Sequence, residues 1–309
     1  MKNKLTKTRF NAVLGIAGRL FGRAASLGAV ILICHSARAQ DLYVSAKDDN
    51  GGTVLRFTWD GVQSTFALGL SAPQGLAMDS AGNLLVADVV SDDPIISLIY
   101  KFSPDGVRST FATLSGLPTD LAFNAAGNLF VSDYGRGNIY QYKPSGARTT
   151  FASGLSRPQG LAFDGAGNLF VGETTYNGHI YRYKPDGTRI TFASGFSGQM
   201  HLACDSAGNL YVSGSFGDIM SGNVYKITPN GVRTIFASGM YAPGSLAFDY
   251  RGNLFVVDSG IPEVSSVIYE FTPAAKRSTF AKAAALADPG LEFNYLAFQP
   301  IQIPNHRQQ

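Results

Sequence analysis

Short apolar runs alternate with polar turns along most of the chain, and residues 161–193 show the pattern most fully. Four runs occur there: LAFD (161–164), LFVGE (169–173), IYRYK (180–184) and RITFA (189–193). The loop GAGN joins the first two runs, and Pro185-Asp186-Gly187 joins the last two. Proline presets φ at the second position of a turn, and glycine accepts a positive φ. The unit therefore predicts four antiparallel strands linked by tight turns.

This unit recurs at a nearly constant period. The central glycines of five AGNL-like copies are spaced 45, 40, 41 and 44 residues apart: Gly82, Gly127, Gly167, Gly208 and Gly252. A period of this size matches a four-stranded blade of a β-propeller. The Pro-x-Gly turn recurs with it at residues 104–106, 144–146 and 229–231, and in degraded form at 273–275.

The two faces of each predicted sheet differ in character. Leu161 and Phe163 point to one face, and Ala162 points to the other, because side chains alternate along a strand. Small residues recur at the second of these positions: Ala77, Ala122, Ala203, Ala247 and Ala297. We expect them to lie near an axis where sheets stack tightly, since a blade with two apolar faces is not stable alone in water.

The two ends of the repeat region complement each other. Residues 41–45 read as a second strand without its first, and residues 295–298 read as a first strand without its second. Pairing them gives a closed, all-β, six-bladed propeller with four antiparallel strands per blade and no exposed sheet edge at the closure. An open β-solenoid is the alternative, and it leaves the complementary ends unexplained.

At this point the chain resembles the six-bladed propellers of the NHL-repeat and SMP-30/gluconolactonase-like group. The resemblance rests on PQGLAMDSAGNLLVAD (73–88), PQGLAFDGAGNLFVGE (158–173) and three looser copies, and it covers residues 41–300. It implies the fold. This repeat is shared by enzymes, binding domains and extracellular proteins, so it does not by itself imply one chemistry.

The first 39 residues differ from the repeat in composition. They contain seven Lys and Arg and no acid, then the apolar stretch AASLGAVILIC and Ala37-Arg38-Ala39. This order predicts an export signal cleaved after Ala39, and a periplasmic or extracellular location. An uncleaved anchor is the alternative, but eleven apolar residues are fewer than the roughly twenty that span a bilayer. The predicted domains are the signal (1–39), the propeller (40–300) and a tail (301–309).

Removing the signal reverses the net charge. Seven of the 25 Lys and Arg lie within it and none of the 22 Asp and Glu, which leaves a net charge of about −4. A nucleic-acid partner has no support in this composition, and the mature chain is expected to be monomeric without a membrane span. Cys204 is the one cysteine after residue 39, so no intrachain disulfide is expected.

Loop variation collects on one face of the predicted ring. The GN hairpins and Pro-x-Gly turns hardly vary, whereas the connections from second to third strand differ in length. We call the face that carries these connections and the blade-to-blade loops the variable-loop face. It includes the segments 45–52, 89–97, 214–222 and 258–266. Variation of this kind favours a binding surface.

On the same face, the residues that begin each first strand are expected to surround the channel mouth. The candidate ligand-binding residues there are Asn294, Gln74, Thr119, Gln159, Met200 and Tyr295. Asp120 and His201 break the local pattern, because most equivalent positions are Gly or Ser. A carboxylate and an imidazole near one axis are suited to act as base and orienter. The alternative is that they bind water or a neighbouring backbone group.

In lactone hydrolases of the similar family, a divalent cation sits at this mouth, held by Glu, Asn and Asp. The resemblance therefore raises a divalent cation, such as calcium, as a candidate cofactor. This chain offers amides and one carboxylate there and lacks the family's E-G-P-x-W opening, so no metal ligand is assigned. A tri-histidine zinc site is not expected either, since of His179, His201 and His306 only His201 maps to the mouth.

Two further repeated positions favour structural roles. Asp88, Asp133, Glu173 and Asp258 end the second strands, where carboxylates commonly cap backbone N–H groups of an adjacent loop. A tyrosine recurs in the third strands and favours packing between blades: Tyr100, Tyr140, Tyr181, Tyr225 and Tyr269.

Two functions remain open at this stage. The first is an exported, non-catalytic propeller that binds a peptide, glycan or partner protein through the variable-loop face. The second is a metal-assisted lactone hydrolase or lyase with a degenerate site at the channel mouth, with Asp120 and His201 as candidate catalytic residues.

Overall fold

Apart from one 3₁₀ residue, Ala283, the regular secondary structure of the described residues is β-strand. The computed structural model describes residues 40–48, 51–215, 222–259, 266–283 and 292–299. The predicted export signal and C-terminal tail lie outside these residues, as do parts of the loops 45–52, 214–222 and 258–266. Within the described residues, no helix is long and apolar enough to cross a membrane.

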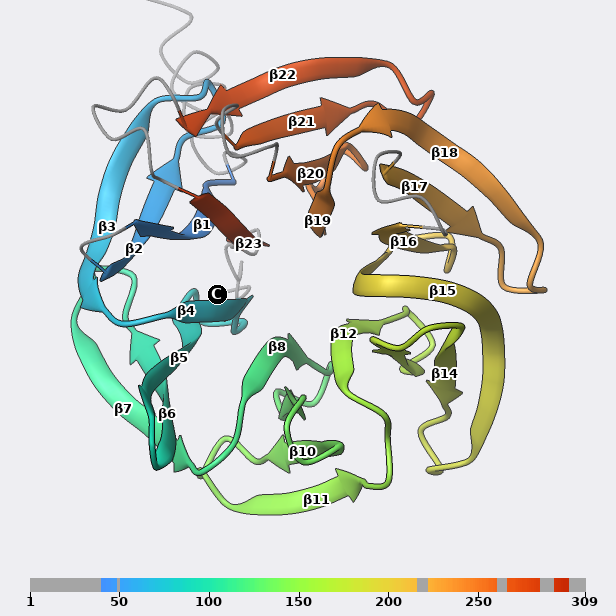
Figure 1. Ribbon diagram of the computed structural model, residues 1–309. Coiled ribbons are helices and arrows are strands. Elements are labelled where there is room, and N and C mark those ends of the chain that lie inside the picture. Colours follow the sequence, from blue (N-terminus) through green and yellow to red (C-terminus); the bar gives the residue numbers. More distant parts are fainter. Residues whose placement is uncertain (1–39, 49–50, 216–221, 260–265, 284–291, 300–309) are drawn as a thin grey trace, which may run out of the picture. The chain divides into compact units, whose positions relative to one another are not determined.

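The strands form five antiparallel sheets arranged around a common centre (Figure 1). One sheet has the order β23 (Glu292–Phe298), β1 (Leu42–Asp48), β2 (Gly51–Phe57), β3 (Gln63–Leu70). The next comprises β4 (Pro73–Met78), β5 (Leu84–Asp92), β6 (Ile95–Phe102) and β7 (Arg108–Leu114). A third comprises β8 (Pro118–Phe123), β9 (Leu129–Asp133), β10 (Asn138–Tyr142) and β11 (Arg148–Ala152).

The remaining strands form two sheets. The larger contains seven strands: β12 (Pro158–Phe163), β13 (Leu169–Glu173), β14 (Gly178–Tyr183), β15 (Arg189–Cys204), β16 (Leu210–Ser215), β17 (Gly222–Ile227) and β18 (Arg233–Met240). The last comprises β19 (Pro243–Phe248), β20 (Leu254–Asp258), β21 (Val267–Phe271) and β22 (Arg277–Lys282).

The prediction of six separate four-stranded sheets therefore needs a correction, because the described residues contain four of them and one sheet of seven strands. The physical reason is β15, which runs for 16 residues without a break. Its first half pairs with β14 as far as Phe196, and its second half pairs with β16 from Ser197 onward. A fourth strand and the following first strand are thereby joined into one.

The two ends of the described chain pair as predicted. Strands β1 and β23 are antiparallel, with Leu42 opposite Phe298 and Val44 opposite Leu296. The Asp41 carbonyl also accepts the N–H of Gln299 at 3.0 Å. Closure in this way removes the free edge that β1 would otherwise present.

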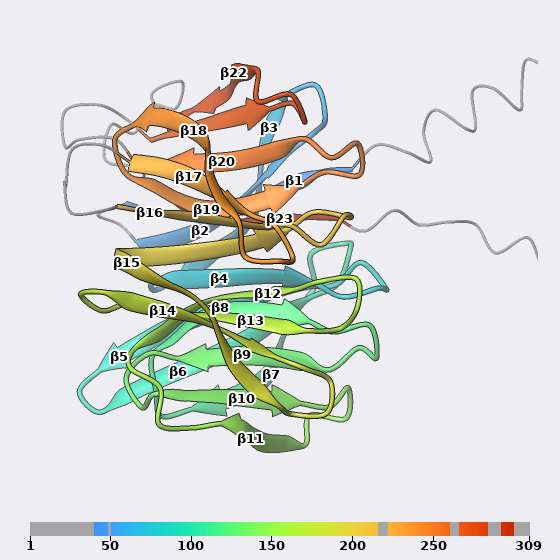
Figure 2. The same ribbon diagram turned by 90° about the vertical axis from the view of Figure 1, so that its right-hand side faces the viewer.

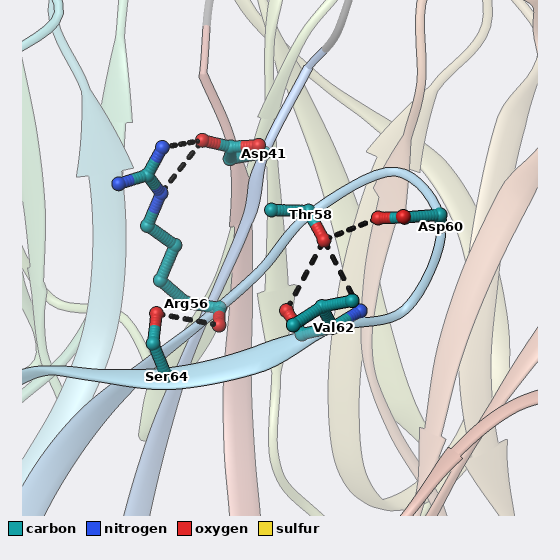
Figure 3. Close-up of polar contacts among 6 residues, drawn as sticks. All are labelled: Asp41, Arg56, Thr58, Asp60, Val62 and Ser64. Atoms are coloured by element: carbon teal, nitrogen blue, oxygen red, sulfur yellow. Dashed lines mark hydrogen bonds and ion pairs between the residues drawn. The ribbon is translucent and has the colours of Figure 1, made fainter. Parts of the chain in front are cut away.

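Side-chain contacts reinforce this closing sheet. In Figure 3 the Arg56 guanidinium points to the Asp41 carboxylate, and Nε donates to Oδ2 at 2.6 Å. The ion pair joins the residue before β1 to Arg56, next to the last residue of β2. The turn after β2 is closed by Thr58, whose Oγ1 accepts the N–H of Val62 at 3.1 Å (Figure 3).

Apolar side chains from neighbouring sheets form the core between them. Tyr43 and Val54 of the closing sheet pack in one cluster with Leu76 and Val86 of the next sheet. Val54 and Val86 are fully buried. Burying a side chain of this kind stabilises a fold by about 1.5–3 kcal/mol relative to leaving it exposed. The predicted packing of blade against blade is thus present.

The GN hairpins take the geometry that their residues predict. In the first, Gly82 has φ 81° and its N–H donates to the Asp79 carbonyl at 3.0 Å. The Asp79 side chain accepts the N–H groups of Ala81 and Asn83. These bonds satisfy backbone donors that the tight turn would otherwise leave without partners.

The tyrosines that recur in the third strands each contact an arginine, which the sequence did not reveal. In each case an arginine of the neighbouring outer strand lies over the ring, at 4.8–5.7 Å from its centroid: Arg108 on Tyr100, Arg148 on Tyr140, Arg189 on Tyr181, Arg233 on Tyr225 and Arg277 on Tyr269. Cation–π contacts of this geometry are worth about 0.5–1 kcal/mol at exposed sites. These arginines also place a positive charge on β7, β11, β15, β18 and β22. A charge on an edge strand discourages edge-to-edge association.

Because the sheets are antiparallel and up-and-down, their connections gather on two opposite faces, as the side view in Figure 2 shows. The loops β5–β6, β9–β10 and β13–β14 lie on the same face as the connections β3–β4, β7–β8 and β11–β12. This is the variable-loop face.

Candidate functional site

The centre of the ring is surrounded by β23, β4, β8, β12, β15 and β19 (Figure 1). Contacts connect β23 with β4, β4 with β8, β8 with β12, β12 with β15, β15 with β19, and β19 again with β23. Every candidate mouth residue lies on one of these strands. The structure therefore brings together residues as distant in sequence as Gln74 and Tyr295.

Asp120, on β8, is buried with 8% of its surface exposed. Its Oδ2 accepts the N–H of Leu161 on the neighbouring strand β12 at 2.8 Å, and its Oδ1 accepts the N–H of Leu121 at 2.9 Å. Burial raises the pKa of the Asp120 carboxyl from 3.8 to about 7, against these two N–H groups, which lower it. At neutral pH the carboxyl is therefore poised between its charged and neutral forms.

His201 and Tyr295 lie edge to face at the centre, with ring centroids 5.0 Å apart and an interplanar angle of 66°. Burial lowers the pKa of His201 from 6.5 to about 4, so the imidazole is neutral at physiological pH. Its Nδ1 is buried and has no hydrogen-bond partner among the described residues. Burial, and to a smaller extent the Asp120 carboxylate, raise the pKa of Tyr295.

Gln159 connects the centre of the ring to the variable-loop face. Its Oε1 accepts the hydroxyl of Thr174 at 2.7 Å and the N–H of Met200 at 3.2 Å. A side-chain hydrogen bond from Gln159 also acts on Tyr295, whose pKa it lowers. Gln159 is 5% exposed and Met200 is fully buried.

The remaining mouth candidates make local contacts. The Thr119 hydroxyl donates to the Pro158 carbonyl at 3.2 Å, and Gln74 Nε2 donates to the Ala72 carbonyl at 3.4 Å. Asn294 is partly buried on β23. Of the predicted mouth residues, Gln159, Met200 and Tyr295 are buried, each with at most 5% of its surface exposed.

Serine hydroxyls inside the ring were missed by the sequence reasoning. Ser45 accepts the N–H of Tyr295 at 3.0 Å and donates to the Gln74 carbonyl at 3.1 Å. Ser132 accepts the N–H of Asp120 at 2.9 Å and donates to the Gln159 carbonyl at 2.7 Å. The signal was present, because serine recurs directly after the repeated Val of the second strands at residues 45, 132 and 213. Ser45 and Ser132 each bridge two neighbouring first strands.

The residues around Asp120 fit a divalent cation poorly. Both carboxylate oxygens already accept backbone N–H groups, and hard cations require several free oxygen ligands. The described residues contain no group of three or more His, Cys, Asp or Glu side chains arranged to hold a metal ion.

The four carboxylates that end the second strands act as caps, as predicted. Asp88 accepts the N–H groups of Ser71 and Ala72, and Asp258 accepts those of Tyr241 and Ala242. The other two do the same for their own blade-to-blade loops: Asp133 for Leu117, and Glu173 for Ser156. Each carboxylate is buried and holds a loop of the variable-loop face in place.

A cavity of about 490 Å³ opens on this face. It lies between the β9–β10 loop (134–137), the β11–β12 loop (155–157 within it) and the β13–β14 loop (174–176 within it). Small-ligand sites typically occupy about 300–1,000 Å³. The cavity was not among the sequence-predicted site residues, but its loops belong to the face that the sequence singled out.

No family model matches the chain, and no curated protein matches it in sequence. Solved structures do resemble it. The crystal structure of TolB from Acinetobacter baumannii has a TM-score of 0.67 at 14% identity, and the match covers 84% of this chain and 66% of that one. The chain thus spans slightly less than two thirds of the length of that protein.

Two enzymes resemble the chain as well. A gluconolactonase from Xanthomonas campestris has a TM-score of 0.59 at 17% identity, with 79% of this chain and 90% of that one covered. Virginiamycin B lyase from Staphylococcus aureus has a TM-score of 0.54 at 16% identity, with 75% and 85% covered. At such low identity these likenesses support the propeller fold alone, because one fold carries many functions.

Proposed function

We propose that this chain is an exported β-propeller that binds a peptide, a glycan or a partner protein through its variable-loop face. The observation that carries the proposal is a contrast between two places. The titratable residues at the centre, Asp120, His201 and Tyr295, are each at most 8% exposed. On the variable-loop face, by contrast, three loops surround a cavity of about 490 Å³. A ligand can therefore reach the cavity without any rearrangement of the buried residues at the centre of the ring.

The proposal includes six blades. The seven-stranded sheet supports this count if β15 serves as the outer strand of one blade and the inner strand of the next. Its 16 residues are about twice the length of β18, and its two halves pair with different partners. With this count we assign the chain to the NHL-repeat and SMP-30/gluconolactonase-like propellers, a proposal supported by the repeat sequence and by the likeness in fold to gluconolactonase.

Export is proposed from residues 1–39, whose basic start, short apolar stretch and Ala-Arg-Ala sequence are typical of a cleaved signal. We place the mature protein in the periplasm or outside the cell, as a monomer.

A metal-assisted lactone hydrolase or lyase is the second candidate. One observation favours it: a carboxyl group with a pKa of about 7 is buried on an inner strand of the ring, as are a tyrosine and the imidazole on which it packs. The imidazole Nδ1 has no hydrogen-bond partner among the described residues. Groups with such pKa values are suited to proton transfer at neutral pH. The residues involved would be Asn294, Gln74, Asp120, Gln159 and His201. The burial of Asp120, Gln159 and His201 and the poor fit to a cation weigh against it.

Screening the full chain on peptide and glycan arrays tests the leading proposal. Two variants change different blades on the variable-loop face, Ile96→Ser and Tyr176→Ser. Trp59→Ser changes an exposed residue of the β2–β3 turn on the opposite face and serves as the control. We expect at least one ligand whose binding falls in a loop-face variant and not in Trp59→Ser. A thermal shift with calcium that is lost in Asp120→Asn, together with lactone turnover, would favour the enzyme instead.

A further inference from the structure

The cavity on the variable-loop face lies where one blade departs from the repeat. In three blades the capping residue is Asp, and it holds the residue just before the first-strand proline: Ala72, Leu117 or Ala242. In the blade of β12 and β13 the cap is Glu173, which is longer by one methylene. Like Asp88 and Asp258, Glu173 accepts the N–H of the residue two before the proline, here Ser156 at 2.7 Å. Among the described residues, however, it makes no bond to the N–H of Arg157, the residue just before Pro158.

The backbone beside this altered cap is unusual. Arg157, between Ser156 and Pro158, has φ 54°, and Asn177 across the cavity has φ 65°. In the described residues, three residues other than glycine have a left-handed backbone, and these are two of them. Left-handed geometry is unfavourable for an arginine, and strain of this kind tends to concentrate at functional sites. Its effect here is to carry the Arg157 side chain to the cavity.

The charged groups that line the cavity are both cationic. Arg157 and Arg136 line it, and the Arg157 guanidinium lies 5.7 Å from the centroid of the Tyr134 ring. Arg136 is partly engaged, because its Nη1 is 3.8 Å from Asp133 Oδ2. Arg157 has no ion-pair partner in the part of the chain that the structure describes. The neighbouring carboxylates Asp133 and Glu173 are buried and already accept N–H groups of the loops.

The rest of the lining is a mixture of hydroxyls and flat aromatic surface. Ser156, Thr174 and Thr175 supply hydroxyl groups, and Tyr134 and Tyr176 supply rings. Tyr176 is 95% exposed, which is unusual for so large a ring and leaves its face free for a ligand. Guanidinium groups bind carboxylates through two parallel hydrogen bonds.

From this combination we propose that the cavity binds an acidic oligosaccharide through the carboxylate of a uronic acid residue. The assignment rests on the proposed binding function of the variable-loop face and names its ligand class. Arg157 pairs with the carboxylate, the hydroxyl side chains bond to sugar hydroxyls, and a tyrosine ring packs on the sugar face. A glycan is favoured over a peptide because the loop N–H groups that a peptide backbone would need are taken. Those of Thr174, Leu155 and Ser156 already have acceptors within the protein.

Calorimetric titration of the full chain with digalacturonate tests this. Its dimethyl ester has the same sugar rings without the charge, and hexaglutamate carries carboxylates without sugar. The variants are Arg157→Gln and Arg157→Gly, the second chosen because glycine suits the left-handed backbone and keeps the loop folded. Arg148→Gln is the matched control, since Arg148 stacks on Tyr140 in the neighbouring sheet and does not line the cavity.

We expect digalacturonate to bind, both Arg157 variants to weaken binding by about tenfold or more, and Arg148→Gln to leave it unchanged. The ester is expected to bind at least about tenfold more weakly than the acid. Equal binding of acid and ester, tighter binding of hexaglutamate, or insensitivity to Arg157 would overturn the assignment. An absence of digalacturonate binding would also overturn it. If a ligand found on the arrays nevertheless bound the wild type and not Ile96→Ser, the proposed function would stand and only the ligand class would be wrong.

Discussion

The carboxylate of Asp120 accepts the backbone N–H of Leu161, on the neighbouring first strand, at 2.8 Å. At the equivalent place in the ring, the hydroxyl of Ser245 accepts the N–H of Leu296 at 3.1 Å. The two side chains therefore make the same connection between adjacent strands. This equivalence supports the structural interpretation of Asp120, in which the carboxylate binds a neighbouring backbone group, over its role as a catalytic base.

Substituting Asp120 is expected to change how stability depends on pH. Burial raises the pKa of Asp120 in the folded protein from 3.8 to about 7. Its protonated carboxyl therefore contributes fully to the free energy of unfolding below pH 3.8, and this contribution is lost as pH rises through about 7. Relative to Asp120→Asn, the wild type should lose up to about 1.4 kcal/mol per pH unit within that window. Urea unfolding of both proteins at pH 5, 6, 7 and 8 measures this. A difference that stays constant over that range would contradict the raised pKa.

His201 should behave in the opposite sense. Burial lowers the pKa of His201 in the folded protein from 6.5 to about 4. Its neutral imidazole therefore contributes to the free energy of unfolding above pH 6.5, and this contribution is lost as pH falls toward 4. An NMR titration of the imidazole should find His201 neutral at pH 6 and charging only near pH 4. His201→Gln should remove the corresponding part of the acid sensitivity in unfolding experiments. A ring that charges near pH 6.5 would show that His201 is solvated.

The carboxylate caps are expected to matter for stability. Asp88→Ala leaves the N–H groups of Ser71 and Ala72 without their acceptor, and each buried unsatisfied donor costs about 1–3 kcal/mol. Asp105→Ala, on an exposed Pro-x-Gly turn, provides the control and should leave the unfolding midpoint close to that of the wild type. Chemical denaturation compares the two. Equal midpoints would mean that the Asp88 cap is replaced by water.

Removal of β23 is expected to open the ring. A chain ending before Glu292 exposes the edge of β1, which should cause aggregation visible by size-exclusion chromatography. A synthetic peptide of residues 292–299 should restore a monomer by adding a strand to that edge, whereas a scrambled peptide should not. A truncated chain that remains monomeric and folded without the peptide would show that closure by β23 is dispensable.

Arg157→Gly should separate stability from binding. At φ 54° glycine relieves the strain of a left-handed arginine, and we expect the free energy of unfolding to rise by up to about 1 kcal/mol. Thermal unfolding measures this, with Arg157→Ala as the control, because alanine keeps the strain and removes the same guanidinium. If glycine and alanine gave equal stability, the backbone at this residue would not be strained.

Much of the architecture could be predicted from the sequence because it is encoded locally. The spacing of the GN hairpins, the Pro-x-Gly turns and the complementary ends predicted all-β sheets, their turns and the pairing of β1 with β23. The caps were predictable for the same reason, since a carboxylate such as Asp88 ends each second strand at a fixed distance from the loop it holds. Each of these features depends on residues that the repeat places at constant separation.

The features that the sequence did not reveal depend on the packing of separate repeats. Whether Gln159, Met200 and Tyr295 line an open mouth or fill the centre is decided by how closely six inner strands approach, which no single repeat encodes. The continuity of β15 was missed because its two halves belong to different hairpins. The cavity beside Arg157 arises where three loops of two consecutive blades meet beside the Glu173 cap. The sequence by itself thus determined the unit, its turns and its closure. The tertiary structure decided which side chains are buried and which line the cavity, because burial depends on neighbours brought together only by the closed ring.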